Sequence, residues 1–427
     1  MSTVISIAAL LAGSALLLLA GGLHGLLLPI RGLAEGFSDG DLGLLGAGWA
    51  FGYMAGCLTV PVIVKRVGHI RSFGALSSLG AITMLLNLLF IEPITWIVLR
   101  AISGFCFAGA AMIVESWLNE RATNETRGRI FGIYTMINLG ATTAGQMLLT
   151  LGNPSGFVFF VVGSIIYSLA LLPTALSTAA SPTPLTKASL DPKLLWRNSP
   201  IAVVAVFLVG ISNGAFGTLG AVYGRRIGLE VSDIAVMMSL ALLAGALIQI
   251  PVGYVSDRMD RRKVLVAMAV MAMGFGTSLS FFGGGNPVLT IALITLFGGT
   301  VYSMYPVIVA HASDHAHPGD FLKTSGGLLL IFGMGTMAGP LLAAALMTAT
   351  YPGALFQVTA GAHLLMLLFA IWRITQRAPV ETEDKTDFVP VVATGRYSTP
   401  ETVALDPRAE QEEFAEEDVS PLDRTDD

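Results

Sequence analysis

The sequence has little charge. Only 12% of its 427 residues are Asp, Glu, Lys or Arg, whereas 54% are hydrophobic and the mean hydropathy is +0.72. Soluble proteins carry about 25% charged residues, which solvate their surface. The shortage of charge therefore argues against a soluble globular protein. It places most of the chain in lipid, where helices satisfy every backbone polar group.

The scarcity of cysteine and the lack of a phosphate-binding loop exclude several classes of function. The two cysteines, Cys57 and Cys106, lie inside apolar runs, so we predict core residues and no disulfide framework. No Gly-Lys-Ser/Thr loop is present to cradle a phosphate, which argues against drive by ATP. We therefore expect no enzyme, no cofactor, no metal and no nucleic acid. The one metal-like cluster, expected to be a solvated loop, consists of His311, Asp314, His315 and His317.

What the sequence does have is long apolar runs. About 20 mostly apolar residues span the hydrocarbon of a bilayer. Twelve runs of that kind lie at about 5–30, 42–64, 72–91, 94–117, 129–151, 156–176, 199–224, 232–255, 264–283, 287–312, 323–348 and 352–374. The first run lacks a basic n-region and a convincing cleavage site, so we expect a retained helix and not a signal peptide. These runs predict an all-α membrane protein with twelve transmembrane helices.

Polar segments divide the chain. Residues 177–198 separate six runs from six, which predicts an N-terminal six-helix bundle at 1–176, a cytoplasmic linker, and a C-terminal six-helix bundle at 199–374. Residues 375–427 hold fifteen acidic and five basic residues and few apolar ones. Such a composition cannot bury a core, so we expect a disordered acidic cytoplasmic tail. A solvated extension is the favoured interpretation, with a regulatory tail as the alternative.

The cations are distributed unevenly among the loops. With the N-terminus inside, the inner loops hold most Lys and Arg, and the outer loops hold only Arg31, Arg225 and Arg226. Lys and Arg collect in short cytoplasmic loops. We therefore expect both termini in the cytoplasm of a bacterium, with the protein integral to the inner membrane.

The two halves of the chain repeat one another. Gly21-x-x-His24-Gly25 in the first run matches Gly210-x-x-Asn213-Gly214 in the seventh, about 190 residues later. Internal repeats of this kind are typical of transporters that bind solute between the repeats near the bilayer midplane. The repeat predicts that the two bundles are pseudo-symmetric.

A charged loop signature lies between the eighth and ninth runs. It reads Gly253-x-x-x-Asp257-Arg258-x-x-Arg261-Arg262-Lys263, and a weaker copy after the second run retains Lys65, Arg66 and Gly68. The pattern resembles the loop signature of the major facilitator superfamily, although Pro61 and Lys65 replace the leading Gly and the Asp in the first copy. Glu115-Ser-Trp-Leu-Asn119 resembles a hallmark of the uncharacterised bacterial YcaD-like branch.

The resemblance implies candidates for the solute cavity, which helices 1, 4, 7 and 10 line in that family. Arg100 begins an Arg-x-x-x-Gly pattern like the family's helix 4 motif, and an Arg in hydrocarbon should face a cavity or a partner. Snorkelling to headgroups is its alternative, and simple packing is the alternative for His24. The cavity candidates are His24, Arg100, Asn138, Gln146, Asn213, Tyr302 and Tyr305. Asn87 and His363 belong to helices 3 and 12, which the resemblance places against lipid.

The resemblance also implies gating residues at the inner face. Glu115 either closes an inner gate or carries a proton, with a water-exposed interfacial carboxylate as the alternative. Asp257 and the neighbouring arginines would latch adjacent helices and release them as the halves rock. The gating candidates are Glu115, Lys65, Arg66, Gly68, Asp257, Arg258, Arg261 and Arg262. Gly48, Gly52 and Gly56 form a stripe for close helix packing.

These features favour a secondary transporter that moves a small organic solute by alternating access. Proton coupling, the direction of transport and the solute stay open. The alternative from another class is a membrane receptor or sensor on the same fold, signalling through the acidic tail. We expect a monomer in the lipid bilayer.

Overall fold

The computed structural model describes residues 2–123, 126–175, 185, 191–317, 320–381, 383, 385–390 and 398–409. These residues form helices joined by loops and turns, and no strand occurs among them. The long helices are α1 (Ser2–Ala34), α2 (Asp39–Val67), α3 (His69–Leu89), α4 (Pro93–Arg121), α5 (Arg127–Met147), α6 (Val158–Ala175), α8 (Pro200–Arg226), α9 (Val231–Arg258), α10 (Arg261–Phe282), α11 (Pro287–Tyr302), α12 (Met304–Ser313), α13 (Phe321–Ala349) and α14 (Ala354–Ile374). The short ones are η1 (Leu148–Leu151), α7 (Pro192–Asn198), α15 (Pro400–Ala404) and η3 (Pro407–Ala409).

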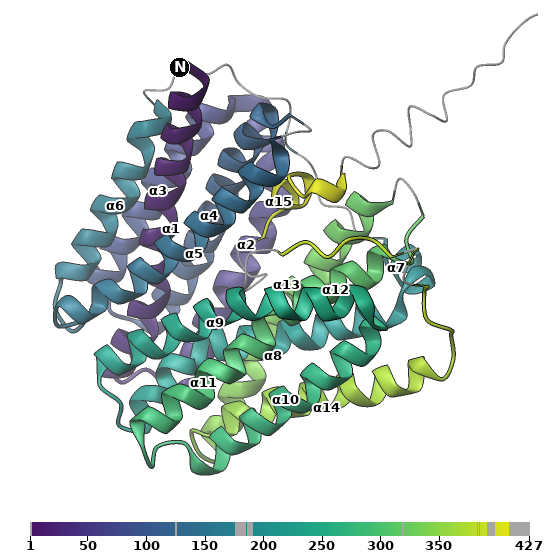
Figure 1. Cartoon of the computed structure of the whole chain (residues 1–427). Coiled ribbons are helices and arrows are strands. Elements are labelled where there is room, and N and C mark those ends of the chain that lie inside the picture. The colour runs from purple at the N-terminus through teal and green to yellow at the C-terminus, as the bar shows by residue number, and fades with distance from the viewer. Residues whose placement is uncertain are drawn as a thin grey trace, which may run out of the picture.

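The helices form two bundles, α1–α6 and α8–α14 (Figure 1). In the first bundle α1 packs on α5 and α6, α2 on α4, and α3 on α6. In the second, α8 packs on α13 and α14, α9 on α11, and α10 on α14. The second set repeats the first, because α11 and α12 are one helix interrupted at Ser303 and correspond to α4. The predicted pair of pseudo-symmetric six-helix bundles is confirmed.

Ten of the described helical spans are long and apolar enough to cross a membrane, with α11 and α12 counted as one span. The remaining two of the twelve are α5 and α6. The apolar helix at Val158–Pro173 within α6 is shorter, and α5 carries Arg127 and Arg129 in its first turn. The predicted runs therefore correspond to twelve helices, of which α5 is the most polar.

The glycine stripe of α2 packs against α4 within the first bundle. A Cβ atom at Gly48, Gly52 or Gly56 would lie 3.1, 1.8 or 2.8 Å from a backbone carbonyl oxygen of α4. Helices that approach this closely need small residues at the contact. The stripe therefore holds two helices of one bundle together, which is the structural interpretation of the motif.

Replacing Gly52 by valine is expected to destabilise the first bundle by about 3 kcal/mol or more, because the Ala101 carbonyl oxygen occupies the position of the new Cβ. Gly140→Val is the matched control, since a Cβ added at Gly140 on α5 would have no neighbouring atom within 4 Å. Thermal unfolding of the detergent-solubilised protein measures the difference. Equal melting temperatures for the two variants would contradict a tight α2–α4 contact at Gly52.

Two polar segments differ from their simple description as linker and tail. Within 177–198, the residues from Asp191 onward are described and include α7, whose Leu195 packs against Gly327 of α13. Within 375–427, residues 375–381, 383, 385–390 and 398–409 are described, and 398–409 is largely buried. The rest of the predicted linker and tail lies outside the described residues, namely 177–184, 186–190, 382, 384, 391–397 and 410–427.

Candidate functional site

The two bundles touch closely at the end where α1 stops and α2 begins, here called the closed end. A Cβ atom at Gly43 of α2 would lie 2.6 Å from Ala344 Cβ and 2.8 Å from the Pro340 carbonyl oxygen, both on α13. Gly46 of α2 similarly faces Thr218 of α8, with 2.3 Å between a Cβ there and the Thr218 side chain. The two glycines thus let the α2 backbone approach α8 and α13 of the second bundle closely at this end.

Two polar contacts reinforce the closed end. Arg226 at the end of α8 forms a 2.9 Å ion pair with Asp39 at the start of α2. Ser239 of α9 donates a 3.1 Å hydrogen bond to Gln146 of α5. Each contact joins one bundle to the other. Gln146, a predicted cavity residue, therefore contributes to the seal between bundles.

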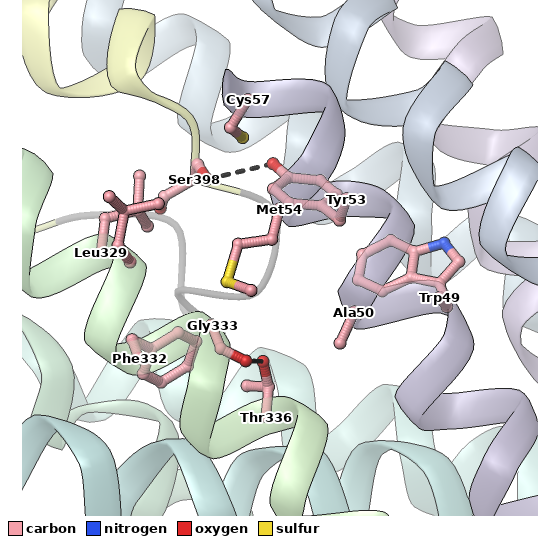
Figure 2. Close-up of a pocket in the computed structure, with 11 residues that line it drawn as sticks. Trp49, Ala50, Tyr53, Met54, Cys57, Leu329, Phe332, Gly333, Thr336 and Ser398 are labelled. Atoms are coloured by element: carbon pink, nitrogen blue, oxygen red, sulfur yellow. Dashed lines mark hydrogen bonds between the residues drawn. The ribbon is translucent and has the colours of Figure 1, made fainter. Parts of the chain in front are cut away.

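At the opposite end, here called the open end, the bundles diverge and α15 lies between them (Figure 1). A pocket there is lined by α2, by α13 and by Ser398, which precedes α15 (Figure 2). Tyr53 donates a 3.0 Å hydrogen bond to the Ser398 carbonyl oxygen. The lining residues are Trp49, Ala50, Tyr53, Met54, Cys57, Leu329, Leu330, Phe332, Gly333, Thr336 and Ser398. Aromatic and aliphatic walls with few polar groups are typical of small-molecule sites.

Glu115 lies at the open end, next to the segment that contains α15. It is fully buried on α4 and accepts a 2.7 Å hydrogen bond from the Tyr134 hydroxyl of α5. The Thr402 hydroxyl donates to the same oxygen over 2.8 Å, and the Thr399 hydroxyl donates to the other oxygen. Burying a carboxylate is costly unless it is hydrogen-bonded. Glu115 is therefore an internal binding group whose partners include the C-terminal segment, and not a water-exposed interfacial residue.

Arg100 is also buried, with 7% of its surface exposed. Its guanidinium carbon lies 5.7 Å from the centre of the Trp49 ring, and Trp49 lines the pocket. Gly25 of α1 faces the same guanidinium group, since a Cβ there would lie 3.7 Å from it. Arg100 thus packs among α1, α2 and α4, directly behind an aromatic wall of the pocket. The snorkelling alternative does not describe this position.

His24 packs inside its own bundle. It is fully buried, its Nε2 lies 3.3 Å from Asn87 Nδ2 on α3, and its ring meets Tyr167 of α6 edge to face. The second bundle has a similar pair, in which His363 Nε2 of α14 lies 3.1 Å from the Ser212 hydroxyl of α8. The expectation that Asn87 and His363 face lipid is wrong, because both side chains are 0% exposed. A buried histidine needs a polar partner, and this requirement is the signal by which the burial of Asn87 and His363 could be recognised from the sequence.

The other cavity candidates are buried in different places. Asn138 of α5 and Asn213 of α8 are 2% and 1% exposed. Tyr302 packs against Gly245 within the second bundle, whereas Tyr305 stacks edge to face on Phe332 and borders the C-terminal segment. The structure thus brings Tyr305, but not Tyr302, to the open end beside α15.

The gating candidates separate into two groups. In the first loop copy, Lys65 and Arg66 are exposed, and Gly68 joins α2 to α3 with a φ of +92°, which suits glycine. In the second copy, Arg258 is exposed and stacks on Tyr254, whereas Arg261 and Arg262 are buried. The second copy is therefore a folded polar network and the first copy an exposed turn.

Arg261 and Arg262 each hold a carboxylate. Arg261 Nε lies 2.7 Å from Asp314 at the end of α12 and Nη2 lies 3.2 Å from Asp257. Arg262 contacts both oxygens of Asp260, at 2.8 Å for the shortest distance. Burial alone would raise the pKa of Asp260, but the hydrogen bonds and charge of Arg262 bring the pKa below its usual value. Asp314, predicted to lie in a solvated loop, is instead an internal ion-pair partner.

Two pseudo-symmetric bundles of membrane-spanning helices, with a largely apolar pocket between α2 and α13, are the architecture of membrane transporters. The family model of the Major Facilitator Superfamily matches residues 10–304 and 203–405. The chain belongs to the Major Facilitator Superfamily.

Among curated proteins, the chain is similar to an uncharacterised MFS-type transporter of Enterobacter sp. (strain 638), with 28% identity over 367 residues that cover 84% of this chain and 94% of the relative. It is also similar to the uncharacterised MFS-type transporter YcaD of Escherichia coli O7:K1 (strain IAI39 / ExPEC), with 26% identity over 372 residues that cover 85% and 94% of the two chains. These matches agree with the resemblance carried by Glu115 to Asn119.

Solved structures that share the fold include two transporters. The nucleoside transporter NupG aligns with a TM-score of 0.70 at 13% identity and covers 86% of this chain and 98% of its own. A bacterial homologue of the human lysosomal transporter Spinster, solved inward-facing and unoccupied, aligns with a TM-score of 0.67 at 15% identity and covers 94% and 98%. At these identities the likeness concerns the fold alone.

Proposed function

We propose that this protein is a secondary transporter that moves a small organic solute by alternating access between its two bundles. The observation that carries the proposal is the asymmetry of the bundle interface. Glycines at Gly43 and Gly46 seal one end, whereas the other end is wide enough to hold α15. Rocking of two repeats about a site between them exposes that site to one side at a time.

In this proposal the open end faces the cytoplasm. The turn with Lys65 and Arg66 and the loop from Arg258 to Lys263 both lie at that end, and short cytoplasmic loops are rich in such cations. The state described is therefore inward-open. The solute would bind beside Trp49, Tyr53 and Thr336, with Arg100 behind the Trp49 ring supplying positive charge.

The proposal is tested by finding a solute and measuring its movement. Purified protein is screened by thermal shift against metabolites and drugs, and each stabilising compound is then tested in proteoliposomes. A carrier gives saturable flux that is accelerated by unlabelled solute on the opposite side. A compound that binds and stabilises the protein but never crosses the vesicle membrane would instead favour the sensor alternative.

Arg100→Ala is expected to reduce flux of such a solute to background, because the cleft loses the positive charge beside Trp49. Arg100→Lys keeps a cation at the position and serves as the matched control for charge. Folded yield and melting temperature are measured beside flux. Parental flux in the alanine variant would remove Arg100 from the transport mechanism.

A further inference from the structure

The C-terminal segment 398–409 lies between the two bundles at the open end, although its composition suggests a solvated tail (Figure 1). Its core is α15, a one-turn helix that begins with a capping box. The Thr399 hydroxyl accepts from the backbone of Thr402, and the Thr402 hydroxyl accepts from the backbone of Thr399. Pro400 occupies the first helical position, where its missing N–H costs nothing. The segment is therefore built to hold a defined shape when docked.

The first bundle binds this segment through polar groups at the inner ends of α4 and α5. The hydroxyls of Thr399 and Thr402 both donate to Glu115. At the far end of α15, Arg127 donates a 2.9 Å hydrogen bond to the Ala404 carbonyl oxygen. The start of α15 thus meets a carboxylate and its end meets a cation, and hydrogen bonds to such charged groups are stronger than those between neutral groups.

The second bundle binds the same segment from the other side. The guanidinium carbon of Arg408 lies 5.1 Å from the centre of the Phe321 ring on α13. Within the segment, a 2.6 Å ion pair with Asp406 holds this guanidinium group in place. Leu405 is fully buried. The segment therefore touches both bundles and occupies the space that the bundles must close when they rock.

A second piece of the tail fastens it to the second bundle. Thr386 donates from its backbone N–H and its hydroxyl to Asp314, at 3.0 and 2.9 Å, and accepts from Arg261. Lys385 donates a 2.6 Å hydrogen bond to the Met259 carbonyl oxygen. The Phe388 ring fills the space at Gly253, where a Cβ would lie 2.3 Å from it. Residues 385–390 thus use the loop signature as an anchor.

From these contacts we propose that residues 398–409 are an intramolecular ligand that binds Glu115 and borders the pocket at the open end. The bound segment keeps the two bundles apart at this end and competes with solute. Anchoring at 385–390 holds the segment close to its site, so that even weak intrinsic binding fills the site by effective concentration. A solute, or a partner that binds the tail, activates the transporter by displacing the segment. The inhibition of transport rests on the proposed function, whereas the docking does not.

Cys57 provides a readout of docking that requires no solute. It is 2% exposed and lines the pocket that Ser398 borders (Figure 2). In a Cys106→Ala background, the rate of Cys57 alkylation by N-ethylmaleimide is compared for the full chain, a chain ending at residue 409 and a chain ending at residue 397. Removal of 410–427 should leave the rate unchanged, and removal of 398–427 should raise it at least about tenfold. Equal rates in all three chains would overturn the proposal.

Point variants test the chemistry of the docking site. Thr399→Val with Thr402→Val removes both hydroxyls that donate to Glu115 and should accelerate alkylation as the truncation does. Thr399→Ser with Thr402→Ser is the matched control, because it keeps both hydroxyls and should stay slow. A synthetic peptide of residues 398–409 added to the chain ending at 397 should restore protection of Cys57. A serine pair as reactive as the valine pair, or a peptide without effect, would count against Glu115 recognition.

Flux separates inhibition from docking. With a transported solute in hand, the chain ending at 397 should show faster flux or a lower half-saturating concentration than the chain ending at 409. Unchanged flux with exposed Cys57 would overturn the inhibitory role. If no solute is moved by either chain, the proposed function fails, and the alkylation rates alone still decide whether the segment docks.

Discussion

Gly43→Leu is expected to abolish transport, because the closed end cannot form around a side chain at this position. The new Cβ would lie 2.6 Å from Ala344 Cβ and 2.8 Å from the Pro340 carbonyl oxygen, across the interface between bundles. Overpacking of this kind costs about 3 kcal/mol. A cost of that size lowers the population of the sealed state on the order of a hundredfold.

Gly40→Leu is the matched control, since Gly40 is exposed on the same helix and the nearest atom to a Cβ there is Ser38 Oγ at 3.5 Å. Accessibility of the closed end is read in a background without Cys57 and Cys106, through a cysteine placed at Ser239. Alkylation of that cysteine from the side of the closed end should accelerate with Gly43→Leu and not with Gly40→Leu. Parental transport by Gly43→Leu would show that the α2–α13 contact is not part of the cycle.

Arg261→Ala is expected to lower the free energy of unfolding by about 3–5 kcal/mol, the cost of removing one partner from a buried ion pair. The side chains of Arg261 and Asp314 are each 1% exposed and lie 2.7 Å apart. Without Arg261, the Asp314 carboxylate keeps Thr386 as a partner but loses its counter-charge. The variant should also loosen residues 385–390, because Arg261 donates to the Thr386 carbonyl oxygen.

Arg258→Ala is the control for Arg261→Ala, because Arg258 belongs to the same loop signature but is exposed. Its loss should change stability by no more than about 0.5 kcal/mol. Denaturant unfolding in detergent measures both variants. Similar losses of stability at the two positions would mean that the loop acts through its total charge and not through the buried network.

The membrane fold could be predicted from the sequence because every helix that spans lipid must be long and predominantly apolar. A run such as 232–255 has no soluble alternative, and the repeat of His24 and Asn213 flanked by glycine revealed the duplication. Hydropathy says nothing about which side of a helix faces its own bundle. The family resemblance, which places helix 3 as a whole against lipid, does not say so either, and the Asn87 amide contacts His24 inside the bundle.

The docked tail escaped prediction for a different reason. Composition predicts only whether a segment can bury a core of its own, and residues 375–427 have too few apolar side chains to do so. Residues 398–409 instead use surfaces of the two bundles, and their polar groups meet Glu115 and Arg127. A helix-start pattern inside this acidic stretch was the local signal. Thr399 is the N-cap residue, Pro400 follows at the first helical position, and Thr402 lies three residues after the cap.

The burial of Thr399 and Thr402 against Glu115 has a consequence for any shortened version of the protein. An acidic tail is often removed before crystallisation. A chain that ends after α14 lacks two of the three hydroxyl groups that donate to this carboxylate. Dissociation constants measured on such a chain would describe a cleft without an internal competitor. These constants would be lower than those of the intact protein. The ratio would equal the fraction of intact molecules in which the segment leaves the site free.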